Sequence, residues 1–124
     1  MDRTLSPVFE KARELIESVL ARHGFRLQTE LLYHSAMGSG QLEYRHRTHW
    51  LRLHWDGKDH WLWLTGAISP DQHAHPGQQR WKPLDPVQDP PRFSQFLEPG
   101  PAADARIAEL LDQIELFRAS RAAV

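Results

Sequence analysis

The sequence predicts an α+β domain in which a four-stranded antiparallel β-meander is combined with an N-terminal and a C-terminal helix. Three observations support this fold class. Apolar residues recur at helical spacing near both ends of the chain, residues 25–66 alternate between apolar and polar side chains, and the 124 residues suffice for one domain. A long loop rich in proline and histidine, residues 69–92, separates the last strand from the C-terminal helix.

The first helix is predicted over residues 7–23. Ser6 is a favourable N-cap, Pro7 suits the first helical position, and Gly24 is a typical C-terminal stop. Between these signals the apolar side chains form one helical stripe, made of Val8, Phe9, Ala12, Leu15, Ile16, Val19 and Leu20.

Four strands are predicted over residues 25–33, 41–46, 49–55 and 60–66. Side chains alternate between the two faces of a strand, and an even-numbered turn after residue 55 gives the sheet one aliphatic face. That face carries Leu51, Leu53, Leu62 and Leu64, and in the first strand Phe25, Leu27, Thr29 and Leu31 are expected to point the same way.

The strand pairing follows from the same pattern. A two-residue turn at Arg47-Thr48 would pair His46 with His49, Tyr44 with Leu51 and Leu42 with Leu53. If Gly57-Lys58 is the next turn, His54 lies opposite Trp61 and Arg52 lies opposite Trp63.

The C-terminal segment predicts a second long helix over residues 102–120, whose stripe consists of Ile107, Leu110, Leu111, Ile114 and Phe117. We expect the first helix on the leucine face, and the last helix near the sheet edge or on the opposite, tryptophan-bearing face. In the intervening loop, Trp81 is expected to pack onto the body of the domain in a short edge strand.

Composition excludes several classes of protein. The net charge of −1 argues against a general electrostatic role on nucleic acids or membranes, and the absence of cysteine excludes disulfides and thiolate sites. The N-terminus lacks the apolar core of a signal peptide, and no apolar run is long enough to cross a membrane. These features predict a cytoplasmic protein, and the low lysine content is typical of a GC-rich bacterial genome.

The tryptophan-bearing face is the main candidate site. Tryptophan and arginine are enriched in binding hot spots, so this face could bind a protein partner. It could instead be covered by the C-terminal helix or by a second copy in a homodimer. The candidate partner-binding residues are Trp50, Arg52, His54, Trp61, Trp63 and Trp81.

The eight histidines give only weak candidates for a metal site, namely His46, His49, His73 and His75. A zinc or nickel site needs three or four ligands in fixed geometry, and two loose pairs do not supply them. We therefore expect no metal and no other cofactor.

No catalytic motif stands out in the sequence. The nucleophile elbow, the phosphate-cradling loop and the paired carboxylates of common enzyme classes are missing. Glu43 lies near His46 and His49, but a regular strand places Glu43 and His46 on opposite faces. Arginines and tryptophans could bind a nucleic-acid strand, yet Glu43, Asp56 and Asp59 are interleaved with them, which makes a nucleic-acid partner unfavourable.

The layout resembles small bacterial α+β proteins, some of which occur beside polymorphic toxins and act as immunity proteins. The comparison rests on His23-Gly24-Phe25-Arg26-Leu27 opening the sheet, and on Leu51–Gly57 leading into Trp61-Leu62-Trp63-Leu64. Immunity proteins usually present an acidic surface to a basic toxin, from which a net charge of −1 departs. The resemblance implies a non-enzymatic protein–protein interaction module of the immunity or accessory type. The alternative is a small enzyme or ligand-binding protein with a pocket between the sheet and loop 69–92.

Overall fold

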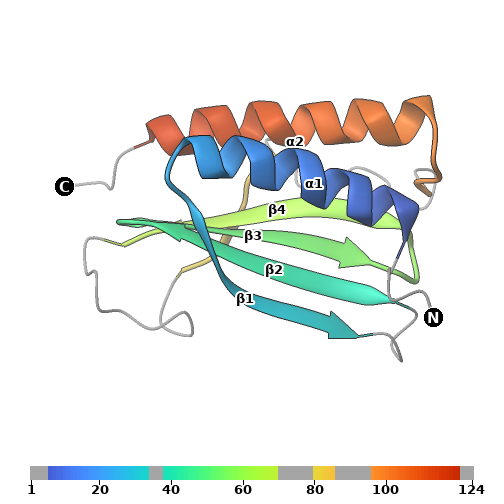
Figure 1. Ribbon diagram of the computed structural model, residues 1–124, viewed down its shortest axis with the longest axis horizontal. Helices are drawn as coiled ribbons and strands as arrows, with labels where there is room; N and C mark the ends of the chain where they lie inside the picture. The colour runs from blue at the N-terminus through green and yellow to red at the C-terminus, as the bar shows by residue number, and fades with distance from the viewer. Residues whose placement is uncertain (1–5, 34–37, 70–79, 86–95, 121–124) are drawn as a thin grey trace.

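The computed structural model describes residues 6–33, 38–69, 80–85 and 96–120, which form two helices and one antiparallel sheet (Figure 1). The elements in chain order are α1 (Pro7–Arg22), β1 (Arg26–Tyr33), β2 (Ser39–His46), β3 (His49–Asp56), β4 (Trp61–Ile68), β5 (Lys82–Pro83) and α2 (Pro101–Ala119). The α+β class and both helices are confirmed. Most of the expected 69–92 loop lies outside the described residues.

The sheet has five strands in the order β1-β2-β3-β4-β5, one more than the four expected. The additional strand, β5, lies beside β4 and follows directly after Trp81. It pairs Pro83 with Thr65 and Lys82 with Gly66, and the Leu84 amide donates to the Leu64 carbonyl at 3.0 Å. The expectation of a short edge strand at this point is therefore confirmed.

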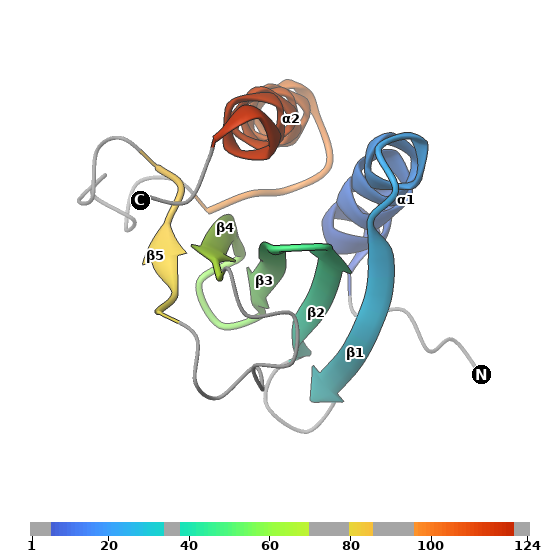
Figure 2. The same cartoon turned by 90° about the vertical axis from the view of Figure 1, so that its left-hand side faces the viewer.

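Both helices lie on the same face of the sheet, which corrects the placement expected for the last helix (Figure 2). Helix α2 packs on the leucine face beside α1, and not on the tryptophan-bearing face or at the sheet edge. The physical reason is width: strands spaced at about 4.8 Å make a leucine face too broad for one helix of about 10 Å diameter. The shared core combines the strand leucines Leu42, Leu51, Leu53, Leu62 and Leu64 with Phe9, Ala12, Ile16 and Leu20 of α1 and Ile107, Leu110, Ile114 and Phe117 of α2.

The turn between β2 and β3 matches the expected register: Leu42 pairs with Leu53, and His46 with His49. The turn between β3 and β4 spans residues 57–60 and not Gly57-Lys58 alone. Consequently His54 lies opposite Trp63 and Arg52 opposite Thr65, which corrects the expected pairs.

The longer turn is stabilised by the side chain of Asp56. Its Oδ1 accepts hydrogen bonds from the Lys58 and Asp59 amides at 2.9 and 3.1 Å. His60 closes the turn with a φ of 49°. Two-residue and four-residue turns keep the same face assignment, so alternation alone could not distinguish them.

A β-bulge in β1 reverses the expected orientation of its second half. Leu27 pairs with Tyr44, but the register then shifts, and Thr29 rather than Gln28 pairs with Glu43. A bulge of this kind adds one residue and exchanges the faces beyond it. Thr29 and Leu31 therefore do not point into the core, and Leu27 is 40% exposed although it lies on the helix side.

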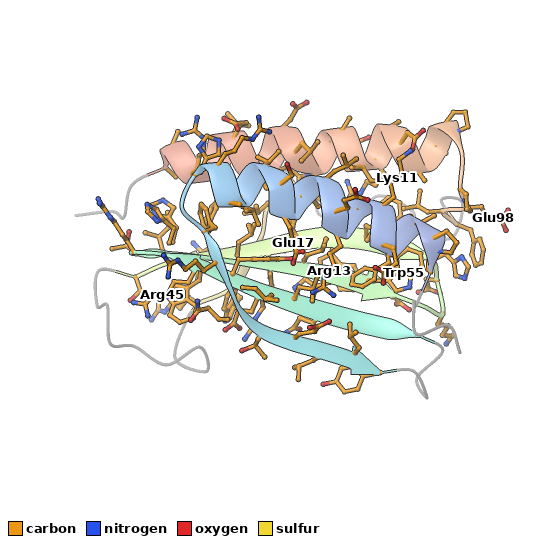
Figure 3. All side chains as sticks on the ribbon, in the orientation of Figure 1. Lys11, Arg13, Glu17, Arg45, Trp55 and Glu98 are labelled. Atoms are coloured by element: carbon orange, nitrogen blue, oxygen red, sulfur yellow. The ribbon has the colours of Figure 1, made fainter. Side chains whose placement is uncertain are left out.

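The bulge also brings Glu30 to the helix side of the sheet, where it pairs with Arg13 of α1. Arg13 and Glu17 point from α1 toward the sheet (Figure 3) and belong to a polar network that joins the two. Arg13 binds Glu30 at 2.7 Å and Glu17 at 3.3 Å, and the buried Tyr44 hydroxyl donates to Glu17 at 2.8 Å. Burial and the neighbouring Glu17 carboxylate raise the pKa of Tyr44 far above its ordinary value, so its hydroxyl remains a proton donor.

Arg106 closes the outer edge of β4 beyond the two residues of β5. Its guanidinium donates to the Leu62 carbonyl through two nitrogens, at 3.0 and 2.9 Å, and forms a bidentate ion pair with Asp85 at 3.0 Å. Gln113 adds a third hydrogen bond to Asp85 at 2.6 Å. A charged side chain thus satisfies a strand carbonyl that no neighbouring strand reaches.

Among the described residues, neither helix combines the length and the apolar character needed to cross a membrane.

Candidate partner-binding surface

The tryptophan-bearing face of the sheet is turned away from both helices (Figure 2), and from here on we call it the second face. Pairing and alternation place the following side chains on it: Thr29, Leu31 and Tyr33 of β1, Gln41, Glu43 and Arg45 of β2, Trp50, Arg52 and His54 of β3, Trp63 and Thr65 of β4, and Trp81 beside them. It has aromatic, cationic and acidic members but no lysine.

Arginine side chains lie over tryptophan rings at two places on this face. The Arg45 guanidinium carbon is 4.4 Å from the centre of the Trp50 ring, and that of Arg52 is 3.8 Å from the centre of the Trp81 ring. Such cation–π contacts are attractive because the ring face is electronegative. They fix the side chains of two strands in one orientation.

Arg52 also pairs with a buried acid. Its Nε donates to Glu43 Oε2 at 2.9 Å, and Glu43 is only 2% exposed. These two residues face each other across β2 and β3. Because the pair is internally neutralised, it adds no net charge to the second face.

The side chain of His54 is also held in one orientation. Its ring is stacked on Trp63 with centroids 4.8 Å apart and planes inclined by 5°, and its Nε2 lies 2.8 Å from the Thr65 hydroxyl. Burial, with a smaller contribution from the nearby Arg52 charge, lowers the pKa of His54 to about 4. The ring is therefore neutral near pH 7.

Five of the six residues expected from the sequence lie on this face: Trp50, Arg52, His54, Trp63 and Trp81. The expectation is wrong for Trp61, which is 4% exposed and belongs to the core beneath α2. The Arg106 guanidinium lies over its ring at 4.4 Å. Trp61 begins β4 at a point that β5 does not flank, so its indole can turn round the strand edge toward α2.

Sequence reasoning missed two members of the second face and the partner of a third. Glu43 was considered only as an acid–base partner of a histidine and as an acidic residue among the arginines, although the expected pairing of Leu42 with Leu53 already places it opposite Arg52. Leu31 and Tyr33, which are 39% and 49% exposed, come to this face through the bulge. No residue near Gln28 signals that bulge.

Two buried polar atoms of the second face, Glu43 Oε1 and Trp50 Nε1, form no hydrogen bond within the described part of the chain. One is an acceptor and the other a donor. Unpaired buried groups raise the energy of the free protein, which a bound polar group or water can relieve. For acid–base catalysis the arrangement is poor, because the lowered pKa of His54 makes its ring a weak base and Glu43 is bonded to Arg52.

The four histidines named as weak metal candidates do not belong to this group of fixed side chains. His46, the last residue of β2, pairs with His49, the first residue of β3, whereas His73 and His75 lie outside the described residues. Within residues 6–33, 38–69, 80–85 and 96–120 there is no group of three or more histidine, cysteine or acidic side chains that could hold a metal ion.

No protein-family model matches the chain, and no curated protein or solved structure shows significant similarity to it.

Proposed function

We propose that this chain is a non-enzymatic protein–protein interaction module, and that its partner, a polypeptide, binds the second face from the β1 side. The observation that carries the proposal is the exposure of Leu31 and Tyr33, which are 39% and 49% accessible on a face that neither helix covers. Large apolar side chains beside fixed tryptophan and arginine residues are typical of protein interfaces.

The electrostatics of the second face favour association. Glu43 neutralises Arg52, and His54 carries no charge near pH 7. A partner therefore covers this part of the face without removing an unpaired ion from water, which would otherwise be a large cost.

Rigidity favours association as well. Stacking and hydrogen bonds already hold Arg52, His54 and Trp63 in one conformation. Immobilising a flexible side chain at an interface costs about 0.5–1.5 kcal/mol. Side chains that are ordered before binding avoid most of that cost.

The outer edge of β1 extends the same surface. β1 is an eight-residue strand at one end of the strand order, and seven of its residues are exposed. An open edge offers backbone donors and acceptors to an added strand. The bulge near Gln28 interrupts this edge, so the regular stretch from Thr29 to Tyr33 is the part available to a partner.

Site-specific photo-crosslinking in the native cell tests the proposal. A photoreactive residue at Tyr33 should capture one protein in stoichiometric yield, and the same residue at Leu116 should not. Leu116 is a suitable control because it is 75% exposed on the outer side of α2. The captured protein must then bind the purified chain; equal capture at both positions, or failure to bind after purification, would contradict the proposal.

A further inference from the structure

The end of the molecule opposite the β3–β4 turn concentrates basic side chains. Both helices run in the same direction, so their C-termini meet there (Figure 1). Arg22 and Arg118 lie in the last turns of α1 and α2, where cations complement the helix dipoles. His46 and His49 belong to β2 and β3 and Arg47 to the turn between them, so the helix dipoles do not explain why these three residues are basic.

A hollow of about 330 Å³ lies among these groups. Its walls carry His23, His46, Arg47, Thr48, His49 and Arg118, and no carboxylate from the described residues. Glu115 is near, but its carboxylate is bonded to His23 at 3.2 Å and to Arg118 at 2.9 Å. The hollow thus places the guanidinium of Arg47 beside His46 and His49, with room for a ligand larger than a water molecule.

The position of His46 in this hollow is set by Gly24. The His46 Nδ1 lies 3.2 Å from the Gly24 carbonyl, and a Cβ on Gly24 would come within 2.8 Å of the same nitrogen. The other ring nitrogen, Nε2, forms no hydrogen bond with the described residues. When the ring is protonated, this nitrogen can donate to an anion.

The backbone of Arg47 has a conformation that is unfavourable for residues with a Cβ atom. Its φ is 53°, in the left-handed region that glycine adopts readily and other residues rarely do. Two hydrogen bonds from outside the turn hold this backbone: Arg45 Nε donates to the Arg47 carbonyl at 3.0 Å, and the Ser69 amide donates to the Thr48 carbonyl at 2.8 Å. Backbone strain that the surroundings enforce is often found at binding sites.

The guanidinium of Arg47 forms no hydrogen bond or ion pair with any other residue in the described part of the chain. We infer that this hollow binds a phosphate dianion, either free or as the end group of a small monoester, with Arg47 as its principal donor. A guanidinium matches the oxygens of phosphate in a bidentate geometry. The site lies apart from the second face and does not depend on the proposed protein partner.

The test compares the wild-type chain with Arg47→Gly and with the control Lys58→Gly. Lys58 is also an exposed turn residue, in the other hairpin, and its loss removes the same charge. Titration calorimetry would use inorganic phosphate in one arm and glycerol phosphate in the other, while NMR follows the ring signals of His46.

Arg47→Gly should weaken phosphate binding by about tenfold or more and should raise the Tm, because glycine relieves the φ of 53°. Lys58→Gly should leave phosphate affinity unchanged, and phosphate should shift the His46 signals of the wild type. Tighter binding of glycerol phosphate would identify a monoester, and equal binding would identify the free anion. Unsaturable binding to the wild type, equal affinity in Arg47→Gly, equal loss in Lys58→Gly, or a lower Tm in Arg47→Gly would each overturn the inference.

Discussion

In β3, the side chain of Leu53 points to one face of the sheet, and those of its two sequence neighbours, Arg52 and His54, point to the other. Leu53 is fully buried under the helices among other aliphatic side chains. Arg52 and His54 instead lie in a layer of stacked rings, an ion pair and hydrogen bonds. The aliphatic face is stabilised by the removal of apolar area from water, whereas the second face is stabilised by specific hydrogen bonds, an ion pair and ring stacking.

The difference predicts how each face responds to a mutation. An apolar contact in a core is lost in proportion to the volume removed. When one partner of a buried polar pair is removed, the loss of unfolding free energy is large, because the partner that remains is buried and unsatisfied. Variants on the two faces should therefore differ in how much unfolding free energy they lose and in whether the losses of single variants add in a double variant.

The largest effect is expected on the aliphatic face. Leu53→Ala should lower the free energy of unfolding by about 4 kcal/mol, since the side chain is 0% exposed and neighbouring strands limit relaxation. Urea denaturation monitored by tryptophan fluorescence measures this loss. A value below about 0.5 kcal/mol, typical of surface substitutions, would show that the helices do not pack on this face.

On the second face, Arg52→Ala should cost about 3 kcal/mol, because it leaves the Glu43 carboxylate buried without its partner. The double variant Glu43→Ala/Arg52→Ala should lose less than the sum of the two single variants, with a coupling of about 1–3 kcal/mol. Equilibrium unfolding of all four proteins completes the cycle. Strictly additive losses would mean that the ion pair does not act as a unit.

Acid should weaken the second face through His54. Its folded-state pKa of about 4 lies below the ordinary value of about 6.5, so the neutral ring is favoured in the folded protein. This contribution is complete above pH 6.5 and is lost progressively as the pH falls toward 4; at pH 5 the loss is about 2 kcal/mol. Unfolding free energies of the wild type and His54→Gln, measured from pH 8 to pH 5, should therefore converge. Parallel curves would contradict the assignment.

The aliphatic face was predictable from the sequence to a large extent. Leu42, Leu51, Leu53, Leu62 and Leu64 all alternate regularly, and any even turn keeps them together. The stripe of α1 was predictable from its helical spacing, except for Leu15, which is 41% exposed. Alternation does not report how wide the resulting face is, and for that reason the position of α2 beside α1 was missed.

The second face was predictable only in part. Trp50, Arg52, His54 and Trp63 were evident from their alternation in β3 and β4, whereas Leu31 and Tyr33 depend on a bulge without a sequence signature. The environment of Trp61 was missed because its contact is Arg106, which is 45 positions away and belongs to α2. Interactions between distant segments leave no periodic signal in either segment.

The most direct measurement is a comparison of binding and stability in one pair of variants, Leu31→Thr/Tyr33→Thr and Leu116→Ala. Threonine retains strand propensity, so both variants should stay within about 0.5 kcal/mol of the wild-type unfolding free energy. With the partner captured at Tyr33, the first variant should raise the Kd about tenfold or more, and Leu116→Ala should leave it unchanged. An unchanged Kd in the Leu31→Thr/Tyr33→Thr variant would contradict the claim that the second face is the partner-binding surface.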